Sequence, residues 1–559
     1  MRLIRYLMGA TLAVGLAGCS DILDVDNENN PDRGRVLGSP SDVQSLASAQ
    51  FQSINNATLG GNARAHIGML AMAFETTALL GNNGLVRGNL PRQGIDNARG
   101  AQYQDENFQD FSRLSSVARN SSDILARVKG SGFALTGATA AGDLNRLKAW
   151  AHFTYGVSLG YLSLAYDSTG VPRPTDGPQD VAPLEGYQAV NAYALAQLDS
   201  ALVYANMPGT SPLPGTGWLS GASGAAVTVP RFIQVIRSYR ARMRAGVARN
   251  PAERNAVDWN AVIADATAGI TSDLMVSMSP SAGWDYRWLA VDLHYRDSNW
   301  HQMPYYIIGM ADVSGGYDTW ISTPRNSRTP FVIQTPDLRF PRGATRAAQV
   351  AVGQAAPTNN TATGDTVRRY FRNRDPSLDQ GASGWQVSFY DHYRFRAFAS
   401  ASRIGDFPVF TRAENDMLAA EGHIRRGNIA PAAALIDRTR TTSGLPALTG
   451  MVTTATQPVP GGANCVPRVP VGPTFTTTAC GNIMEAMKWE KRMEIAYTTY
   501  GAWYFDSRGW GDLPEGTAVH WPTPTQELDA RRLPIYNVGG IGQPDGAGPS
   551  TYGFGSGDR

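Results

Sequence analysis

The segment from Asp143 to Ala165 constrains the fold of this chain more than any other. In it, small and large residues alternate at helical spacing: Ala149, Ala151, Gly156 and Gly160 are small, and Trp150, Phe153, Tyr155 and Tyr161 are aromatic. Small side chains on one helix let a second helix approach closely, as in the helix pairs of tetratricopeptide repeats. The segment therefore predicts closely packed helix pairs. Since no strict repeat period is visible, an ordinary amphipathic helix is the alternative.

Helical periodicity recurs along most of the chain. Further helices are predicted from residue 41 and at 67–80, 103–128, 187–204, 230–248, 259–270, 411–426, 430–441 and 483 to about 500. Hydrophobic residues make up 42% of the chain, which is enough for a large core. We therefore predict a mainly α protein, with a tetratricopeptide-like scaffold over 41–280 and 406–510.

Between about 281 and 405 the helical pattern fades and aromatic residues crowd together. The aromatic residues from 284 to 320 include Trp284, Tyr286, Trp288, Tyr295, Trp300, Tyr305, Tyr306, Tyr317 and Trp320. So many aromatic side chains argue against disorder. Long irregular segments of this kind are usually functional. We interpret this stretch as a large irregular, aromatic-rich insertion in a single domain that spans 41–559.

The first nineteen residues have the layout of a secretory signal peptide. Arg2 and Arg5 precede a short apolar run, and small residues come directly before Cys19. The sequence Leu-Ala-Gly-Cys resembles a bacterial lipobox, which predicts a signal peptide over 1–18 and lipidation of Cys19. The acidic, Asn-rich stretch over 19–40 would then be a flexible tether. An ordinary secretory signal with an incidental cysteine is the alternative.

Charge and cysteine content exclude some classes of protein and predict a disulfide. The net charge is +2 and the arginines are spread along the chain, so there is no basic stripe for nucleic acid. Beyond Cys19, the only cysteines are Cys465 and Cys480. In an oxidising compartment this pair favours a disulfide, and two free thiols are the alternative.

Signatures of catalysis, metal binding and cofactor binding are missing from the sequence. It contains no Gly-x-Ser-x-Gly elbow, no Walker-type phosphate loop and no Gly-x-Gly-x-x-Gly. The seven histidines never fall at metal-site spacing on one helix. We therefore expect no catalytic residue, no metal and no cofactor, and a binding protein in place of an enzyme.

Several stretches, in order along the chain, resemble the SusD/RagB family of outer-membrane nutrient-binding lipoproteins. The N-terminal stretches are CSDILDVDNENNP after the lipobox and AYDSTGVP at the end of the 143–165 helix. The segment 413–448 matches the family's helix pair through Glu414, Glu421, Gly427, Ala433, Arg440, Gly444 and Leu445. The segment from 490 matches through Glu490, Arg492, Glu494, Gly501, Asp506, Arg508 and Trp510, and WPTPTQELDA follows it. Tyr500 and Trp503 depart from the pattern, standing where the family usually has Glu and Arg.

This resemblance implies a mainly helical protein that is lipid-anchored in the outer membrane, on the extracellular face. Family members sit as lids on a TonB-dependent barrel transporter of the SusC type and bind glycans or other nutrients. The resemblance therefore implies two partners: the transporter, and an oligosaccharide or other nutrient. The charged motifs after Glu414 and Glu490 are interpreted as structural.

The aromatic insertion is the first candidate for the ligand site, because Trp and Tyr offer a flat apolar face with one polar group. The predicted stacking residues are Trp284, Tyr286, Trp288, Trp300 and Trp320. Asp292 and Asn299, with Asp285 and Gln302, would bond to sugar hydroxyls. Core packing or a transporter interface is the alternative for these aromatics. The Asn- and Gly-rich loop over 81–100 is a second candidate.

Two hypotheses about function therefore stay open. The first is a nutrient-binding lipoprotein that delivers its ligand to a barrel transporter. The second is a helical-repeat scaffolding or assembly lipoprotein that binds only protein partners. The second hypothesis predicts that the aromatic residues lie in a core or in a protein interface.

Overall fold

The structure is a computed structural model that describes residues 36–61, 64–77, 84–177, 180–287, 302–354, 370–379 and 388–555. The signal peptide, Cys19 and most of the tether lie outside these ranges. The chain divides into a short unit, Met1–Leu46, and a large one, Ala47–Arg559. The helix α3 (Pro40–Ser48) crosses the boundary between them, and all that follows concerns the large unit. No helix within the described ranges is both long and apolar enough to cross a membrane.

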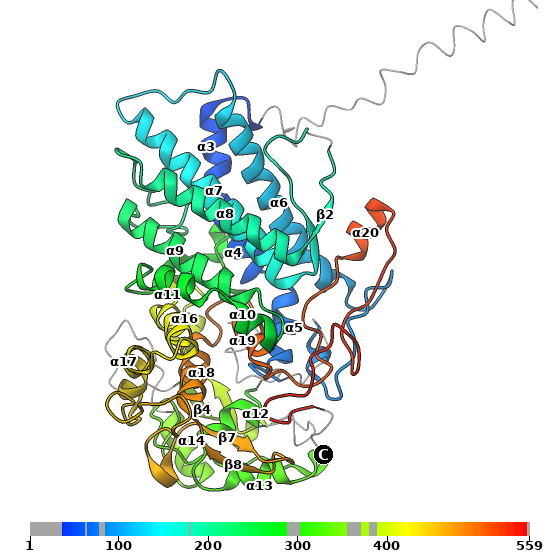
Figure 1. Cartoon of the computed structure of the whole chain (residues 1–559), viewed down its shortest axis with the longest axis vertical. Helices are drawn as coiled ribbons and strands as arrows, with labels where there is room; N and C mark the ends of the chain where they lie inside the picture. Colours follow the sequence, from blue (N-terminus) through cyan, green and yellow to red (C-terminus); the bar gives the residue numbers. More distant parts are fainter. Residues whose placement is uncertain are drawn as a thin grey trace, which may run out of the picture. The chain divides into compact units, whose positions relative to one another are not determined.

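The first part of the large unit is built from long helices that pack side by side (Figure 1). Its helices are α4 (Gln50–Thr58), α5 (Arg64–Met72), α6 (Gln104–Lys129), α7 (Ala140–Ala165), α8 (Tyr187–Ala205) and α9 (Val229–Gly246). The central helix, α7, packs against α6 and α8, and α9 packs against α8. Strands β1 (Ser168–Gly170) and β2 (Leu184–Gly186) form a short antiparallel ladder between α7 and α8.

Glycines of α7 allow this close packing. A Cβ on Gly156 would lie 2.7 Å from Cγ of Leu198 on α8, and one on Gly160 would lie 2.6 Å from Sδ of Met243 on α9. Contacts this short do not occur for a real Cβ, so neither position has room for a larger residue. The prediction that small residues on this helix admit neighbouring helices is confirmed.

The second part contains the helices that carry the charged motifs. They are α10 (Pro251–Ala256), α11 (Trp259–Thr267), α16 (Arg412–Arg425), α17 (Ile429–Arg440), α18 (Ile483–Ile495), α19 (Ala502–Trp510) and α20 (Thr525–Arg531). The helix α16 packs against α11, α17 and α18, and a buried apolar cluster that includes Met417, Ile436 and Met487 joins α16, α17 and α18. The mainly α fold with packed helix pairs is therefore confirmed.

A two-stranded ladder closes the irregular insertion at its base. Strand β3 (Leu274–Met278) pairs antiparallel with β6 (Gly405–Phe410), so the two ends of the insertion meet. The elements described inside it are short: α12 (Tyr305–Ile308), α13 (Gly316–Ser322), α14 (Arg346–Gln354), α15 (Arg396–Ser400), β4 (Phe371–Asn373) and β5 (Tyr390–His392). This agrees with the weak periodicity of the insertion sequence.

The predicted helix from 483 to about 500 is wrong at its C-terminal end. The helix α18 ends at Ile495, and α19 begins at Ala502 after a turn in which Tyr497 and Gly501 have φ of 58° and 55°. The backbone N–H of Tyr497 donates to Oε1 of Glu75 over 2.7 Å, and its hydroxyl donates to the carbonyl of Glu75. A partner distant in the sequence therefore ends the helix, which local periodicity cannot reveal.

The charged residues of the motifs form buried ion pairs. Arg242 donates to both carboxylate oxygens of Glu414 at 2.7 Å, and Arg339 does so to Glu490 at 2.9 and 3.0 Å. At the two atypical positions, the Tyr500 hydroxyl donates to Asp110 over 2.9 Å and Trp503 Nε1 donates to the carbonyl of Arg492 over 2.9 Å. Hydrogen bonds therefore hold the segment at these two places.

Candidate functional site

Three of the predicted stacking aromatics are core residues. Trp284 and Trp320 are each 3% exposed and Tyr286 is fully buried. The Trp320 ring lies 5.0 Å from that of Tyr306, with the Arg328 guanidinium 4.3 Å from its centroid. None of the three presents a ring face to solvent in this structure. This agrees with core packing, the alternative that the sequence left open for these aromatics.

The other predicted contacts fall partly outside the described residues. Trp288, Asp292, Asn299 and Trp300 lie outside the described residues, so their roles stay predictions. Of their neighbours, Gln302 is 2% exposed and accepts a hydrogen bond from the N–H of Ser388. Asp285 is paired with Arg403 at 2.7 Å.

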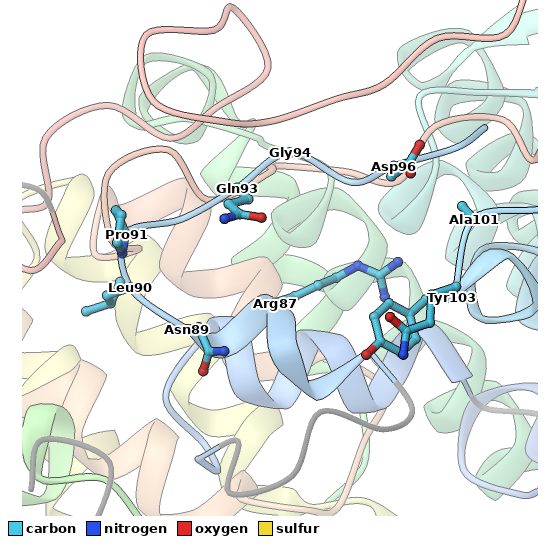
Figure 2. Close-up of a pocket in the computed structure, with 10 residues that line it drawn as sticks. Arg87, Asn89, Leu90, Pro91, Gln93, Gly94, Asp96, Ala101 and Tyr103 are labelled. Carbon is cyan, nitrogen blue, oxygen red and sulfur yellow. The ribbon is translucent and has the colours of Figure 1, made fainter. Parts of the chain in front are cut away.

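The loop between α5 and α6, the second candidate of the sequence, forms a pocket of about 400 Å³ (Figure 2). We call it the loop pocket. Its lining residues are Arg87, Asn89, Leu90, Pro91, Gln93, Gly94, Asp96, Ala101, Gln102 and Tyr103. Tyr103, which lies just beyond the loop as the sequence delimits it, supplies an aromatic ring. The sequence signal for it is an aromatic residue directly before a helix at the end of a polar loop.

The C-terminal segment holds the loop in place. The N–H of Ile95 donates to the carbonyl of Val538 over 2.7 Å. The side-chain amide of Asn97 donates to the carbonyl of Thr523 over 2.9 Å, and the backbone carbonyl of Asn97 accepts from the hydroxyl of Thr525. These bonds join residues more than 400 positions apart. Backbone and side-chain groups both take part in these hydrogen bonds. The position of the pocket wall therefore depends on the C-terminal segment as well as on the loop itself.

Arg87 is fixed in the loop pocket by partners on α6. It belongs to the 3-10 turn η1 (Leu85–Gly88) and extends toward Tyr103 (Figure 2). Its Nη1 donates to Oε2 of Glu106 over 2.9 Å, and its Nη2 donates to Oδ1 of Asn107 over 3.0 Å. The guanidinium carbon lies 5.9 Å from the centroid of the Tyr103 ring. This geometry holds the cation beside the aromatic ring.

Burial shifts the pKa values of this pair. Burial raises the pKa of Glu106 to about 7, although the neighbouring Arg87 opposes the rise. Burial also lowers the pKa of Arg87, opposed by Glu106.

The polar groups of the loop pocket match the hydroxyls of a sugar. Asn89, Gln93 and Gln102 carry amides that both donate and accept hydrogen bonds, whereas the Asp96 carboxylate only accepts. The phenol ring of Tyr103 adds an apolar face. The lining holds one arginine and one aspartate, so its formal charge is zero.

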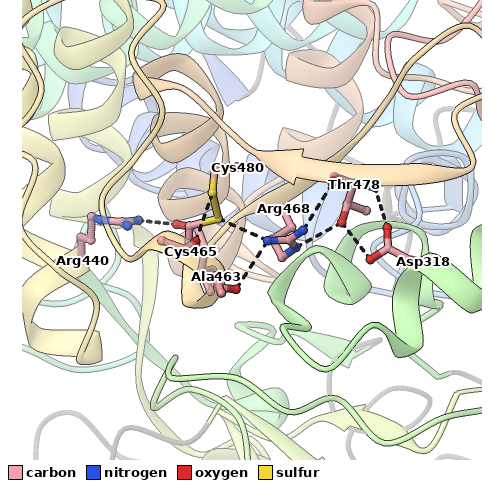
Figure 3. The surroundings of a disulfide bond; sticks show 9 residues. Asp318, Arg440, Ala463, Cys465, Arg468, Thr478 and Cys480 are labelled. Carbon is pink, nitrogen blue, oxygen red and sulfur yellow. Dashed lines mark hydrogen bonds between the residues drawn. A yellow bond between two sulfur atoms is a disulfide. The ribbon is translucent and has the colours of Figure 1, made fainter.

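Cys465 and Cys480 form a disulfide that joins the loop before β7 (Arg468–Val471) to the end of β8 (Thr477–Cys480), the two strands of a hairpin (Figure 3). The hairpin is bound to α13, because Asp318 accepts from the N–H of Thr478 over 2.5 Å and from its hydroxyl over 3.2 Å. The disulfide therefore constrains a hairpin that is itself bound to α13.

No protein-family model matches the chain, and no curated protein matches it in sequence. Solved structures do match it along most of its length. A SusD superfamily protein from Bacteroides vulgatus has 11% identity and a TM-score of 0.51, with 88% of this chain and 97% of that one covered. One from Bacteroides thetaiotaomicron has 15% identity and a TM-score of 0.51, covering 88% and 96%. A SusD homolog from Parabacteroides distasonis has 12% identity and a TM-score of 0.50, covering 82% and 83%.

The chain therefore has the fold of the SusD superfamily. This is the fold that its sequence motifs indicate, and the match extends over nearly the full length of the solved structures.

Proposed function

We propose that this protein is a lipid-anchored, cell-surface nutrient-binding protein that takes up an oligosaccharide in the loop pocket. It would pass the ligand to a TonB-dependent barrel transporter in the outer membrane, on which it acts as the lid. The SusD-like fold supports this proposal, as do the lipobox at Cys19 and the chemistry of the pocket.

The observation that carries the ligand part is the loop pocket itself. A ring, a fixed guanidinium and several amides line one cavity, and hydrogen bonds to the C-terminal segment hold its wall. A wall that is already ordered loses little conformational entropy when a ligand binds. This arrangement suits a ligand with many hydroxyls and an apolar ring face.

The test is calorimetric titration with a panel of oligosaccharides, for the wild type and for Tyr103→Ala. Loss of the ring should weaken binding about three- to tenfold, the range for one aromatic contact. Phe133→Ala is the matched control, because this half-buried aromatic lies outside the pocket lining. Equal affinities for Tyr103→Ala and the wild type would place the ligand elsewhere.

Trp288→Ala and Trp300→Ala extend the titration to the insertion. Since both residues stay proposed stacking contacts, each change should weaken oligosaccharide binding by a similar factor. If neither change weakens oligosaccharide binding and Tyr103→Ala does, the ligand contacts lie in the loop pocket alone.

Anchoring and transport call for separate experiments. Metabolic labelling with a fatty acid should mark the wild type and not Cys19→Ser, and surface proteolysis of intact cells should degrade the anchored protein. A pull-down from outer membranes should recover a barrel transporter. A labelled protein that is protected from external protease would contradict the extracellular location.

The burial of Trp284, Tyr286 and Trp320 favours a second candidate, a scaffolding lipoprotein that binds only protein partners. That hypothesis expects aromatics in a core. The same titration separates the two, because a scaffold should bind no oligosaccharide while still recovering a protein partner from membranes.

A further inference from the structure

A second pocket lies between α6, the β1 strand and α20 and is lined by different residues from the loop pocket. Its volume is about 350 Å³, near the lower end of the roughly 300–1,000 Å³ that small-ligand pockets occupy. We propose that this pocket binds a single sugar ring or a similar neutral polyol.

Two hydroxyls in the wall of this pocket carry the inference. Ser115 on α6 and Thr169 on β1 both line it. Their side-chain oxygens are buried, and neither has a hydrogen-bond partner within the described part of the chain. Thr169 is only 1% exposed. A buried hydroxyl without a partner is unfavourable, so such groups are rare in folded proteins. A polyol bound in the pocket would supply the missing bond.

Three of the four charged groups of the pocket are paired with an opposite charge, and the fourth, Asp180, accepts a hydrogen bond from the N–H of Gly177. Arg531 donates to Glu527 over 2.7 Å and to the carbonyl of Ala182 over 2.6 Å. Arg119 donates to the carbonyl of Gly177 over 2.8 Å and pairs with Asp123 at 3.4 Å. The lining holds two arginines and two carboxylates, so no net charge favours an ion. A neutral ligand with several hydroxyls fits this balance.

The rest of the pocket wall is formed by apolar side chains and by the backbone of β1. Phe111 packs its ring edge-on against Tyr166 at 5.0 Å and forms one side with Pro172. A Cβ on Gly170 would lie 2.8 Å from Nη2 of Arg531, so this guanidinium borders the pocket beside β1. An apolar side next to hydroxyls and guanidinium N–H groups suits a ring with C–H faces and a polar rim. This inference does not depend on what occupies the loop pocket.

The test uses Thr169→Val, which keeps the shape of the side chain and removes its hydroxyl, and Ser115→Ala. Glucose, galactose, xylose and glucuronate are the probes, measured by saturation-transfer NMR on the full protein. A neutral sugar should bind the wild type, and each variant should weaken it about three- to tenfold, as for one neutral hydrogen bond. Thermal stability should stay unchanged or rise, because neither hydroxyl has a partner among the residues that the structure describes.

Ser116→Ala is the matched control, since this neighbouring hydroxyl is bonded to the carbonyl of Ser112 and does not line the pocket. It should leave sugar binding unchanged. Three results would overturn the inference: no binding of any neutral probe, binding of glucuronate alone, or binding that Tyr103→Ala abolishes and Thr169→Val does not. The last result would leave the function proposed for the loop pocket standing.

Discussion

At the scale of single residues, Glu75 shows how a buried carboxyl shapes the chain around it. It is 2% exposed and accepts from the backbone N–H of Tyr497. Burial raises the pKa of Glu75 to about 8, although the bond from Tyr497 opposes the rise. The protein therefore favours the protonated carboxyl at neutral pH.

This shift predicts a loss of stability as the pH rises. The pKa in the folded state lies above the ordinary value of 4.5, so the contribution of Glu75 is complete below pH 4.5 and is lost as the pH rises through about 8. In urea unfolding of the wild type between about pH 5 and 9, the free energy of unfolding should fall as the pH rises. Glu75→Gln keeps an acceptor and cannot ionise, so its slope should be shallower.

Glu515→Gln is the control for Glu75, since it changes a half-buried glutamate at another place. It should keep the wild-type slope. An unchanged slope in Glu75→Gln would show that the carboxyl is not protonated in the folded protein.

At the scale of elements, the contact of α7 with its neighbours depends on glycine. Gly156→Ala gains helix propensity of about 1 kcal/mol but places a methyl 2.7 Å from Leu198 and 2.9 Å from the carbonyl of Ala194. The backbone carbonyl cannot move aside easily, so we expect a net loss of about 1–3 kcal/mol in unfolding free energy. Chemical denaturation measures this loss. Gly548→Ala, in open space, should change stability by less than about 0.5 kcal/mol.

The disulfide is a second element-scale feature with a measurable effect. Cys465 and Cys480 are 15 positions apart, and a loop of this length contributes about 3 kcal/mol in the chain-entropy model. The double variant Cys465→Ala/Cys480→Ala should lose a comparable amount of unfolding free energy. Reductant should lower the stability of the wild type and leave the double variant unaffected. Equal stability of the two proteins in oxidising buffer would contradict this.

At the scale of the whole molecule, buried arginines join helices that are far apart in the sequence. Arg254 of α10 donates to both oxygens of Glu421 on α16, at 2.9 and 2.6 Å, and to Asp506 on α19 at 3.0 Å. Its side chain and that of Glu421 are fully buried. Burial alone would raise the pKa of Glu421, but Arg254 and nearby cations hold it well below the ordinary value.

Removing one partner should therefore be costly. Arg254→Met leaves the Glu421 carboxylate buried with less compensation, and we expect a loss of about 3–5 kcal/mol. The double variant Arg254→Met/Glu421→Gln removes that charge and should recover much of the loss. Denaturation of both variants and of the wild type measures this. A double variant no more stable than Arg254→Met would show that Arg254 acts by packing alone.

Features that depend on local sequence could be predicted, and features that depend on contacts between distant segments could not. Helix periodicity is local, so the sequence located α6, α7, α8 and α16 within a few residues. The break after Ile495 was missed, because it depends on Glu75 from another part of the chain. For the candidate site, the sequence indicated the polar loop but not Tyr103. Whether an aromatic is a binding face or a core residue depends on which segments cover it.

The sequence alone therefore determined that the chain is mainly helical, that its helices pack closely through small residues, and which motifs it carries. These follow from local spacing and residue size. Only the tertiary structure decided that Trp284, Tyr286 and Trp320 are core residues and that the loop before α6 forms a pocket and is hydrogen-bonded to the C-terminal segment. Burial and cavities arise from contacts between distant segments, which no local pattern records.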